Sequence, residues 1–367
     1  MRRPETPAVV KGRGTTAQPA NRFAMERAEA VDDGWDIPHD YDADGEAAEP
    51  PRTEVTEERA RSIISRNDSP DVGFSQSINP FRGCEHGCVY CFARPSHAYL
   101  DLSPGLDFET KLYAKTNAAE RLRVELAKAS YRAAPIALGI NTDAYQPIER
   151  KHRITRGILE VLAETKHPVS LITKSALVER DLDLLAPMAK LGLATVYFSI
   201  TTLDNHLAAK MEPRASAPHR KLKAMRTLRD AGVPVGVMVA PVIPVITDPE
   251  LETILEAARN AGAGAASYVL LRLPHEVKAI FRDWLAQRYP ERAGHVMSII
   301  RQMRGGKDYD ATFGKRMRGE GPFAQLLRRR FALAHARLGF GRLPPLRCDL
   351  FVPPSAPVPP SPQGNLF

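Results

Sequence analysis

The chain has 367 residues, of which 43% are hydrophobic and 26% charged, enough for one large domain with extensions. Its charged N-terminal stretch lacks the apolar core of a secretory signal, and its longest apolar stretch, residues 233–246, contains three prolines and is too short to span a bilayer. We therefore expect a cytoplasmic protein that does not bind a membrane. The formal net charge is +8, which favours polyanionic partners or reflects a solvated basic surface.

The predicted elements begin after a polar arm. Residues 1–55 are rich in proline, alanine and charge, lack hydrophobic periodicity, and are predicted to be disordered. Six apolar runs then predict strands at residues 74–79, 135–140, 168–173, 195–200, 234–240 and 266–271. Amphipathic stretches between and after them predict helices at residues 117–129, 154–165, 177–191, 219–231, 249–261 and 277–287. Thr116 or Asn117, with Glu120 following, is predicted to cap the first of these helices.

The apolar runs are continuously hydrophobic rather than alternating, as in strands that are covered on both faces. Six strands, each followed by a helix, predict a parallel sheet with right-handed crossovers. The fold class is therefore α/β, a partial (β/α)6 TIM-like barrel over residues 56–290, because the repeats end near residue 290. Residues 291–345 are predicted to form a basic, partly helical C-terminal extension, and residues 346–367 a proline-rich tail without a helix or a central strand.

Three of the four cysteines follow the first predicted strand. Cys84, Cys88 and Cys91 have the spacing C-x3-C-x2-C, and loops at the carboxyl ends of parallel strands commonly hold ligands. A structural zinc site needs a fourth ligand, for which His86 or His97 is available. A redox disulfide uses only the C-x2-C pair. A [4Fe-4S] cluster uses all three thiolates and leaves one iron open, and the spacing favours this interpretation.

The motif and several other segments resemble a known family. The C-x3-C-x2-C loop with Tyr90 before its last cysteine is similar to the signature of radical S-adenosylmethionine (SAM) enzymes. The segments SINPFRGCEHGCVYCFARPSHAY, DFETKLYAKTNA, NTDAYQPIE, LITKS, EPRASAPHRKLKAM and APVIPVITD resemble the spore photoproduct lyase branch and its uncharacterised relatives. The resemblance covers residues 70–290.

The resemblance implies an enzyme that contains a [4Fe-4S] cluster and uses SAM. In the family, SAM binds the open iron. One electron from the cluster then cleaves SAM to methionine and a 5′-deoxyadenosyl radical that abstracts hydrogen. Flavodoxin or ferredoxin is the implied type of electron donor. A DNA-repair lyase-like reaction on nucleic acid is the implied activity. A radical SAM reaction on a small molecule or peptide, and a non-enzymatic zinc-binding module, are the alternatives.

The resemblance also assigns roles to single residues. Tyr90 is expected to pack beside the adenine, unless it is an ordinary core residue. Lys174, at the end of the third predicted strand, is expected to neutralise the SAM carboxylate, and a solvated lysine is the alternative. Ser199, at the end of the fourth, is expected to reach the ribose or the methionine.

Two further groups of residues receive roles in the same way. Asn141, Thr142 and Asp143, at the end of the second predicted strand, are expected to face the methionyl part of SAM. For Asp143, a cap of the next segment, which is a frequent role of aspartate, is the alternative. Glu212 and Arg214 are expected to bind the ribose and the substrate side, and a local ion pair between them is the alternative.

One position differs from spore photoproduct lyase. That enzyme has a cysteine before the corresponding Thr-Ser-Asp, and the cysteine returns a hydrogen atom to the thymine radical, whereas this chain has Ile140. Repair by the same route is therefore not expected. Cys348 is the other available hydrogen donor, and a buried, inert cysteine is the alternative for it.

Two segments near the C-terminus point to partners. A basic stretch favours nucleic acid through counterion release and base stacking, although Leu326, Leu327, Phe331 and Leu333 have the spacing of a helix core. Its cations are Lys315, Arg316, Arg318, Arg328, Arg329, Arg330, Arg337 and Arg342, interleaved with Phe323, Phe331 and Phe340. The pentapeptide with Gln363, Leu366 and Phe367 resembles the tails by which bacterial repair proteins dock on the DNA sliding clamp.

Overall fold

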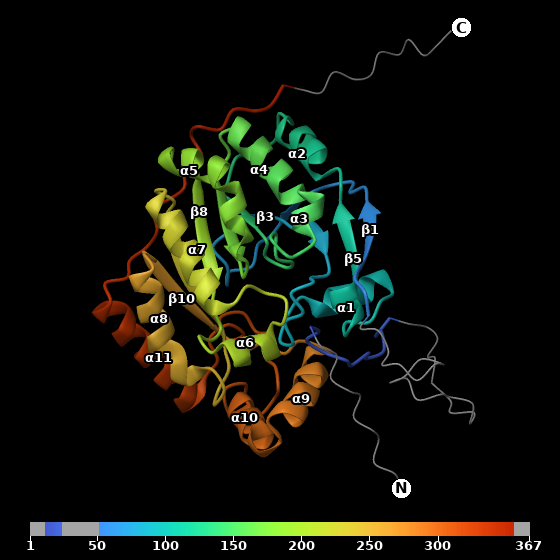
Figure 1. Ribbon diagram of the computed structural model, residues 1–367, viewed down its shortest axis with the longest axis vertical. Helices are drawn as coiled ribbons and strands as arrows, with labels where there is room; N and C mark the ends of the chain where they lie inside the picture. Colours follow the sequence, from blue (N-terminus) through green and yellow to red (C-terminus); the bar gives the residue numbers. More distant parts are fainter. Residues whose placement is uncertain (1–11, 24–50, 356–367) are drawn as a thin grey trace, which may run out of the picture.

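The computed structural model of the chain describes residues 12–23 and 51–355 (Figure 1). Its centre is a seven-stranded sheet with the strand order β10-β9-β8-β7-β6-β3-β2. Neighbouring strands from β3 to β10 are parallel, and β2 (Ile64–Arg66) pairs antiparallel with β3 at one edge. The six parallel strands are β3 (Gln76–Ile78), β6 (Ile136–Leu138), β7 (Val169–Thr173), β8 (Ala194–Ser199), β9 (Val235–Val242) and β10 (Ala265–Leu270). All six lie at the predicted runs, which confirms the α/β fold.

Helices follow the strands and cover the outer side of the sheet (Figure 1). In α4, Ile158, Leu159 and Leu162 face the sheet and are buried, while Glu160 and Glu164 face solvent. Burying each such aliphatic side chain contributes about 1.5–3 kcal/mol. The covering helices are α2 (Ala118–Leu126), α4 (Ile154–Glu164), α5 (Leu182–Lys190), α7 (Pro218–Asp230) and α8 (Leu251–Asn260). The shorter ones are η1 (Arg94–Leu100), α1 (Asp107–Thr110), α3 (Glu149–His152), η2 (Ala176–Asp181), α6 (Asn205–Met211) and η3 (Asp248–Glu250).

A second, three-stranded sheet lies beside the first strand–helix unit. Its order is β1-β5-β4, with β1 (Glu54–Glu58) parallel and β4 (Phe81–Arg82) antiparallel to β5 (Lys111–Lys115). Because a single residue separates β4 from Cys84, this sheet fixes the start of the cysteine loop.

The C-terminal extension packs closely on the barrel. The helices α9 (Val277–Arg288) and α10 (Pro290–Gln302) share an apolar cluster with the cysteine loop, and the boundary predicted at residue 290 falls on the first residue of α10. Helix α11 (Gly321–Arg337) packs on α8. Among the described helices, none combines the length and apolar character needed to cross a bilayer.

The first part of the C-terminal tail packs against the amino ends of the parallel strands. The backbone N–H of Arg347 donates to the carbonyl of Gly192 at 2.9 Å, and that of Val352 donates to the carbonyl of Thr165 at 2.9 Å. Both acceptors lie just before strands, so residues 347–352 lie across the amino ends of β7 and β8. As predicted, the described part of this tail contains neither helix nor strand.

The N-terminal arm differs from the expected disorder over part of its length. Residues 12–23 pack against the cysteine loop and α1, and Arg13 and Thr15 are buried. Residues 51–55 run into β1. The polar composition of residues 12–23 did not predict this packing. Most of the contacts are made by backbone groups, a glycine and a hydrogen-bonded arginine, which leave no hydrophobic pattern in the sequence.

Candidate active site

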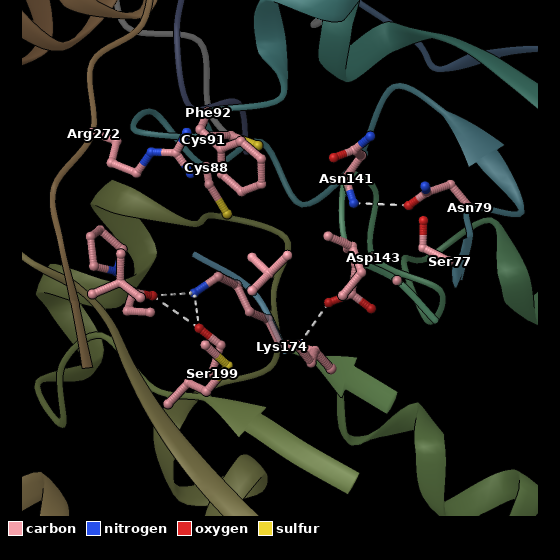
Figure 2. A pocket seen from close by; sticks show the side chains of 18 of the residues that line it. Ser77, Asn79, Cys88, Cys91, Phe92, Asn141, Asp143, Lys174, Ser199 and Arg272 are labelled. Atoms are coloured by element: carbon pink, nitrogen blue, oxygen red, sulfur yellow. Dashed lines mark hydrogen bonds between the residues drawn. The ribbon is translucent and has the colours of Figure 1, made fainter. Parts of the chain in front are cut away.

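One cavity of about 560 Å³ lies at the carboxyl ends of the parallel strands. Cys84, Cys88 and Cys91 all line it, and Figure 2 shows the last two beside Phe92. Tight turns bring the three cysteines together, since the N–H of Gly87 donates to the carbonyl of Cys84 and the N–H of Cys91 donates to that of Cys88. Gly87 has a φ of +65°, which favours glycine at this turn. The spacing thus places three thiols on one wall.

The chemistry of the three thiols fits an iron–sulfur cluster. Burial raises the pKa of Cys84, Cys88 and Cys91 above the ordinary thiol value, and neighbouring carboxylates raise the pKa of the first two further. A bound metal centre supplies the positive charge that stabilises the thiolate form of such buried thiols. The cavity volume is in the range of cofactor sites.

The two histidines considered as zinc ligands have different surroundings. His97 Nε2 lies 2.9 Å from the carbonyl oxygen of Lys111, and its ring packs edge-on against Phe108. His86 lies on the cavity wall, with Nδ1 3.4 Å from Asp143. Only His86 is therefore placed beside the thiols.

The ends of β3 and β6 form a second wall of the cavity. Asn79 Oδ1 accepts a hydrogen bond from the N–H of Asn141 at 2.8 Å, which fixes the loop after β6 (Figure 2). Asp143 accepts from the Thr173 hydroxyl at 2.7 Å and from the backbone N–H of Lys174 at 2.6 Å. Asn141 and Asp143 both line the cavity, and Asp143 also holds the ends of β6 and β7 together.

The ends of β7 and β8 contribute Lys174 and Ser199, which also line the cavity. Lys174 Nζ donates to Ser199 Oγ at 2.9 Å and to the carbonyl of Ala240 at 3.3 Å, and it lies 3.0 Å from Glu212 Oε2. Burial alone would lower the pKa of Lys174, but the charge of Glu212 raises it above the usual lysine value. The cavity therefore has a fixed ammonium group in its wall.

Glu212 lies behind that wall. It is not among the residues that line the cavity, although it was expected to bind the ribose or the substrate side. The carboxylate is 3.1 Å from Lys221 Nζ and 3.0 Å from Lys174 Nζ, and it accepts a hydrogen bond from the Tyr90 hydroxyl at 2.7 Å. Burial raises its pKa, but the two ammonium groups and the hydroxyl lower it to about 2. Glu212 thus balances two buried cations and orients Tyr90, which itself lines the cavity.

Thr142 and Arg214 also lie outside the cavity wall. The Thr142 hydroxyl donates to the carbonyl of Phe81 at 3.0 Å and is buried there. Arg214 lies 2.9 Å from Glu85. These two residues therefore do not line the cavity, and the ion pair considered between Glu212 and Arg214 does not form, because each has another partner.

The sequence reasoning missed Arg272 and Phe92. Arg272 follows β10 and lines the cavity, with its guanidinium carbon 4.9 Å from the centre of the Phe92 ring (Figure 2). Its Nε is buried and has no hydrogen-bond partner in the described part of the chain. Its position in the sequence could have predicted this, since Arg272 directly follows the sixth predicted strand as Lys174 directly follows the third.

Two expectations for the C-terminal region need correction. The three interleaved phenylalanines pack inward rather than offering faces to bases, since Phe331 lies 4.8 Å from Tyr268 and Phe340 is buried. Arg330 pairs with Glu252 at 2.6 Å. Of the basic stretch, Arg316 alone lines the cavity, and Arg328, Arg329, Arg337 and Arg342 are exposed elsewhere. The C-terminal pentapeptide lies outside the described residues.

Cys348 cannot serve as the hydrogen donor in this structure. It lies in the docked tail, next to Arg347, at the amino ends of the strands. The cavity lies at their carboxyl ends, where Ile140 lines it. The length of the strands therefore separates Cys348 from the cavity.

Comparisons with known proteins agree with this geometry. The sequence profile of the Radical SAM superfamily matches residues 78–258. An uncharacterised protein of Mycobacterium tuberculosis is 38% identical over 231 residues, which are 62% of this chain and 68% of the relative. An uncharacterised protein of Methanocaldococcus jannaschii is 27% identical over 240 residues, 65% of this chain and 85% of the relative.

Among solved structures, spore photoproduct lyase has a similar fold. A mutant form with bound AdoMet and dinucleoside spore photoproduct has a TM-score of 0.55 and 16% identity, over 78% of this chain and 80% of that chain. The chain belongs to the radical SAM superfamily. It is an enzyme of that superfamily, whose members use a [4Fe-4S] cluster and SAM.

Proposed function

We propose that Cys84, Cys88 and Cys91 hold the [4Fe-4S] cluster and that the enzyme reductively cleaves SAM to act on nucleic acid in a lyase-like reaction. The observation that carries the proposal is that three cysteines, Cys84 and Cys88 buried and Cys91 partly buried, line one cavity at the strand ends. The cluster, when bound, supplies one electron and an open iron for SAM. Reduced flavodoxin or ferredoxin in the cytoplasm is the proposed electron source.

The cavity wall supplies the proposed contacts to SAM. Asn141 and Asp143 offer an amide and a carboxylate, which suit an ammonium and a hydroxyl group. Lys174 holds a positive charge beside them and orients Ser199. Tyr90, fixed by Glu212, presents its ring for packing against adenine. The roles of Thr142, Glu212 and Arg214 are to support this wall from behind.

The charge at the outer part of the cavity supports an anionic substrate. Arg66, Arg272 and Arg316 line it, and Arg316 is held by Asp71 at 2.5 Å and by Ser69 at 2.6 Å. Arg272 has a buried N–H without a partner among the described residues, and burying such a donor unpaired is costly. A phosphate or a nucleobase carbonyl would satisfy it. The dinucleoside lesion bound by the structurally similar lyase supports the same substrate class.

The substrate class can be tested directly. We expect the anaerobically reconstituted and reduced protein to form 5′-deoxyadenosine from SAM, and we expect UV-irradiated DNA to change the rate and to yield an altered nucleotide. Chromatography of nucleosides after digestion measures both. Identical 5′-deoxyadenosine formation with and without irradiated DNA or RNA, with no altered nucleotide, would favour a small-molecule or peptide substrate.

Paired variants locate the nucleic-acid contact. Changing Arg66 and Arg272 to glutamine is expected to lower the slope of log affinity against log salt by about 2, since each phosphate contact contributes about one counterion. Changing Arg328 and Arg329 removes the same charge from the exposed side of α11 and is the matched control. A larger effect of the α11 pair would move the proposed interface to that helix.

We also propose that the C-terminal pentapeptide docks on the DNA sliding clamp. Deleting residues 363–367 is expected to abolish co-purification with the purified clamp, because Gln363, Leu366 and Phe367 are the residues that match the docking pattern. A chain in which only Gly364 and Asn365 are changed to alanine is the control and is expected to bind. Retention of clamp binding by the deletion variant would reject this partner.

A further inference from the structure

Residues 13–22 form a strap along the outer side of the cysteine loop (Figure 1, the dark blue segment beside α1 and α9). The carbonyl of Ala17 accepts a hydrogen bond from the N–H of Leu106 at 3.1 Å. The carbonyl of Pro19 accepts from the Ser103 hydroxyl at 2.8 Å. At its end, Arg22 forms an ion pair with Glu276 at 2.9 Å. The strap is therefore fixed along its whole length.

The tightest contact joins the strap to the cysteine motif itself. A Cβ on Gly14 would lie 1.7 Å from the carbonyl oxygen of Gly87, which stands between Cys84 and Cys88. Gly14 also donates its backbone N–H to Glu109 Oε2 at 2.8 Å. Only a glycine allows the two backbones to approach this closely.

Glu109 connects Gly14 to Cys88 through Arg94. Its carboxylate is fully buried and forms an ion pair with Arg94, which is also fully buried. Arg94 Nε donates to the carbonyl of Cys88 at 2.9 Å. Arg13 Nη1 donates to the carbonyl of Glu109 at 3.0 Å. The strap thus supplies donors to both the side chain and the backbone of the residue that anchors Arg94.

Arg13 also reaches the other side of the cysteine motif. Its Nη2 donates to the carbonyl of Pro51 at 2.7 Å and to the Thr53 hydroxyl at 3.0 Å. The Thr53 hydroxyl in turn donates to Glu85 Oε1 at 2.7 Å, directly after Cys84. Two hydrogen-bonded paths therefore run from the strap to the residues that flank Cys84 and Cys88.

We propose that this strap holds the cysteine loop in its ligand-ready conformation and covers the side of the loop that faces away from the cavity. Arg13 and Gly14 are positioning residues, because they act on the thiols through Glu109, Arg94 and the loop backbone. The inference rests on the proposed cluster and adds a part of the chain that lies outside the barrel. Opening the strap would expose the loop without unfolding the barrel.

Gly14→Ala and Arg13→Met test the strap in the full-length holoprotein. Gly294→Ala is the matched control, because a Cβ there meets nothing within 4 Å. Under anaerobic conditions, both strap variants are expected to release iron to a ferrous chelator at least about tenfold faster than the control, since buried hydrogen bonds to charged groups are lost. The electron paramagnetic resonance signal of the reduced cluster is expected to change in both.

Hydrogen exchange provides a readout that does not depend on iron. The amides of residues 84–94 are expected to exchange faster in both strap variants than in Gly294→Ala, while the strands of the barrel keep their protection. Unchanged exchange of residues 84–94 together with unchanged iron release would overturn the strap's role. Faster exchange of residues 84–94 accompanied by an equal loss of protection in the barrel strands would overturn it too. Failure of the wild-type chain to bind iron would instead contradict the proposed function, and exchange would still decide the strap.

Discussion

Replacing Cys84, Cys88 or Cys91 with alanine is expected to abolish both the brown colour of anaerobically reconstituted protein and the formation of 5′-deoxyadenosine from SAM. Two thiolates cannot hold the cluster with a single open iron, because an iron that loses its thiolate is exposed to solvent and the cluster loses iron. Iron and sulfide analysis, the visible spectrum and chromatography of the nucleoside measure the loss, which we expect to be complete for each single variant.

Cys348→Ala is the matched control for these variants. Cys348 lies in the tail segment that docks at the amino ends of β7 and β8, whereas the cavity lies at the carboxyl ends. We therefore expect it to retain iron and SAM cleavage at the wild-type level. If any of the three motif variants kept a full iron content and formed the nucleoside, the cluster could not be held by these residues.

Glu212→Gln is expected to lower the free energy of unfolding by about 3–5 kcal/mol, because it leaves two buried ammonium groups without a counter-charge. Lys174 and Lys221 lie 3.0 and 3.1 Å from the carboxylate, and the carboxylate is buried. SAM cleavage should fall with stability, since Tyr90 and Lys174 lose the group that fixes them. Denaturant unfolding of the wild type and the variant, together with the nucleoside assay, measures both effects.

The cost of Glu212→Gln should depend on pH in a defined direction. The pKa of Glu212 is lowered from 4.5 to about 2 in the folded chain, so its ionised form stabilises the fold above about pH 4.5, and this contribution is lost as pH falls towards 2. The difference between wild type and variant is therefore expected to shrink between about pH 5 and pH 2. A difference of the same size at pH 3 and pH 7 would contradict the role of this carboxylate.

Glu164→Gln is the control for this prediction. Its ion pair with Arg123 is exposed, with the side chains 54% and 39% accessible, and exposed pairs contribute less than about 1 kcal/mol. The same chemical change at the two sites thus separates a buried counter-charge from a surface pair.

Local sequence determined the elements of the barrel and the ligand loop. Continuous apolar runs and helical periodicity predicted all six parallel strands, because burial on two faces and the 3.6-residue repeat are properties of a local segment. The spacing of Cys84, Cys88 and Cys91 is also local, since a three-residue and a two-residue spacer can be closed by turns. The strand-end rule likewise placed Asn141, Asp143, Lys174 and Ser199 on the cavity wall.

Asn117 shows where local rules stopped. Its position predicted a cap for its own helix, but its side chain binds the backbone N–H and carbonyl of Ala60. The segment that follows β1 offered a buried pair of backbone groups, and satisfying them outweighs a helix cap that water can replace.

Contacts between distant segments decided the rest of the site. Glu212 had a suitable sequence position for a ribose contact, yet Lys174 and Lys221 from two other elements draw it behind the wall. Arg13 and Gly14 lie in a polar arm without periodicity, yet they close on Glu109 and Gly87. The physical reason is that charge pairing and close backbone approach depend on which residues the folded chain brings together, and that information lies in the tertiary structure rather than in any one segment.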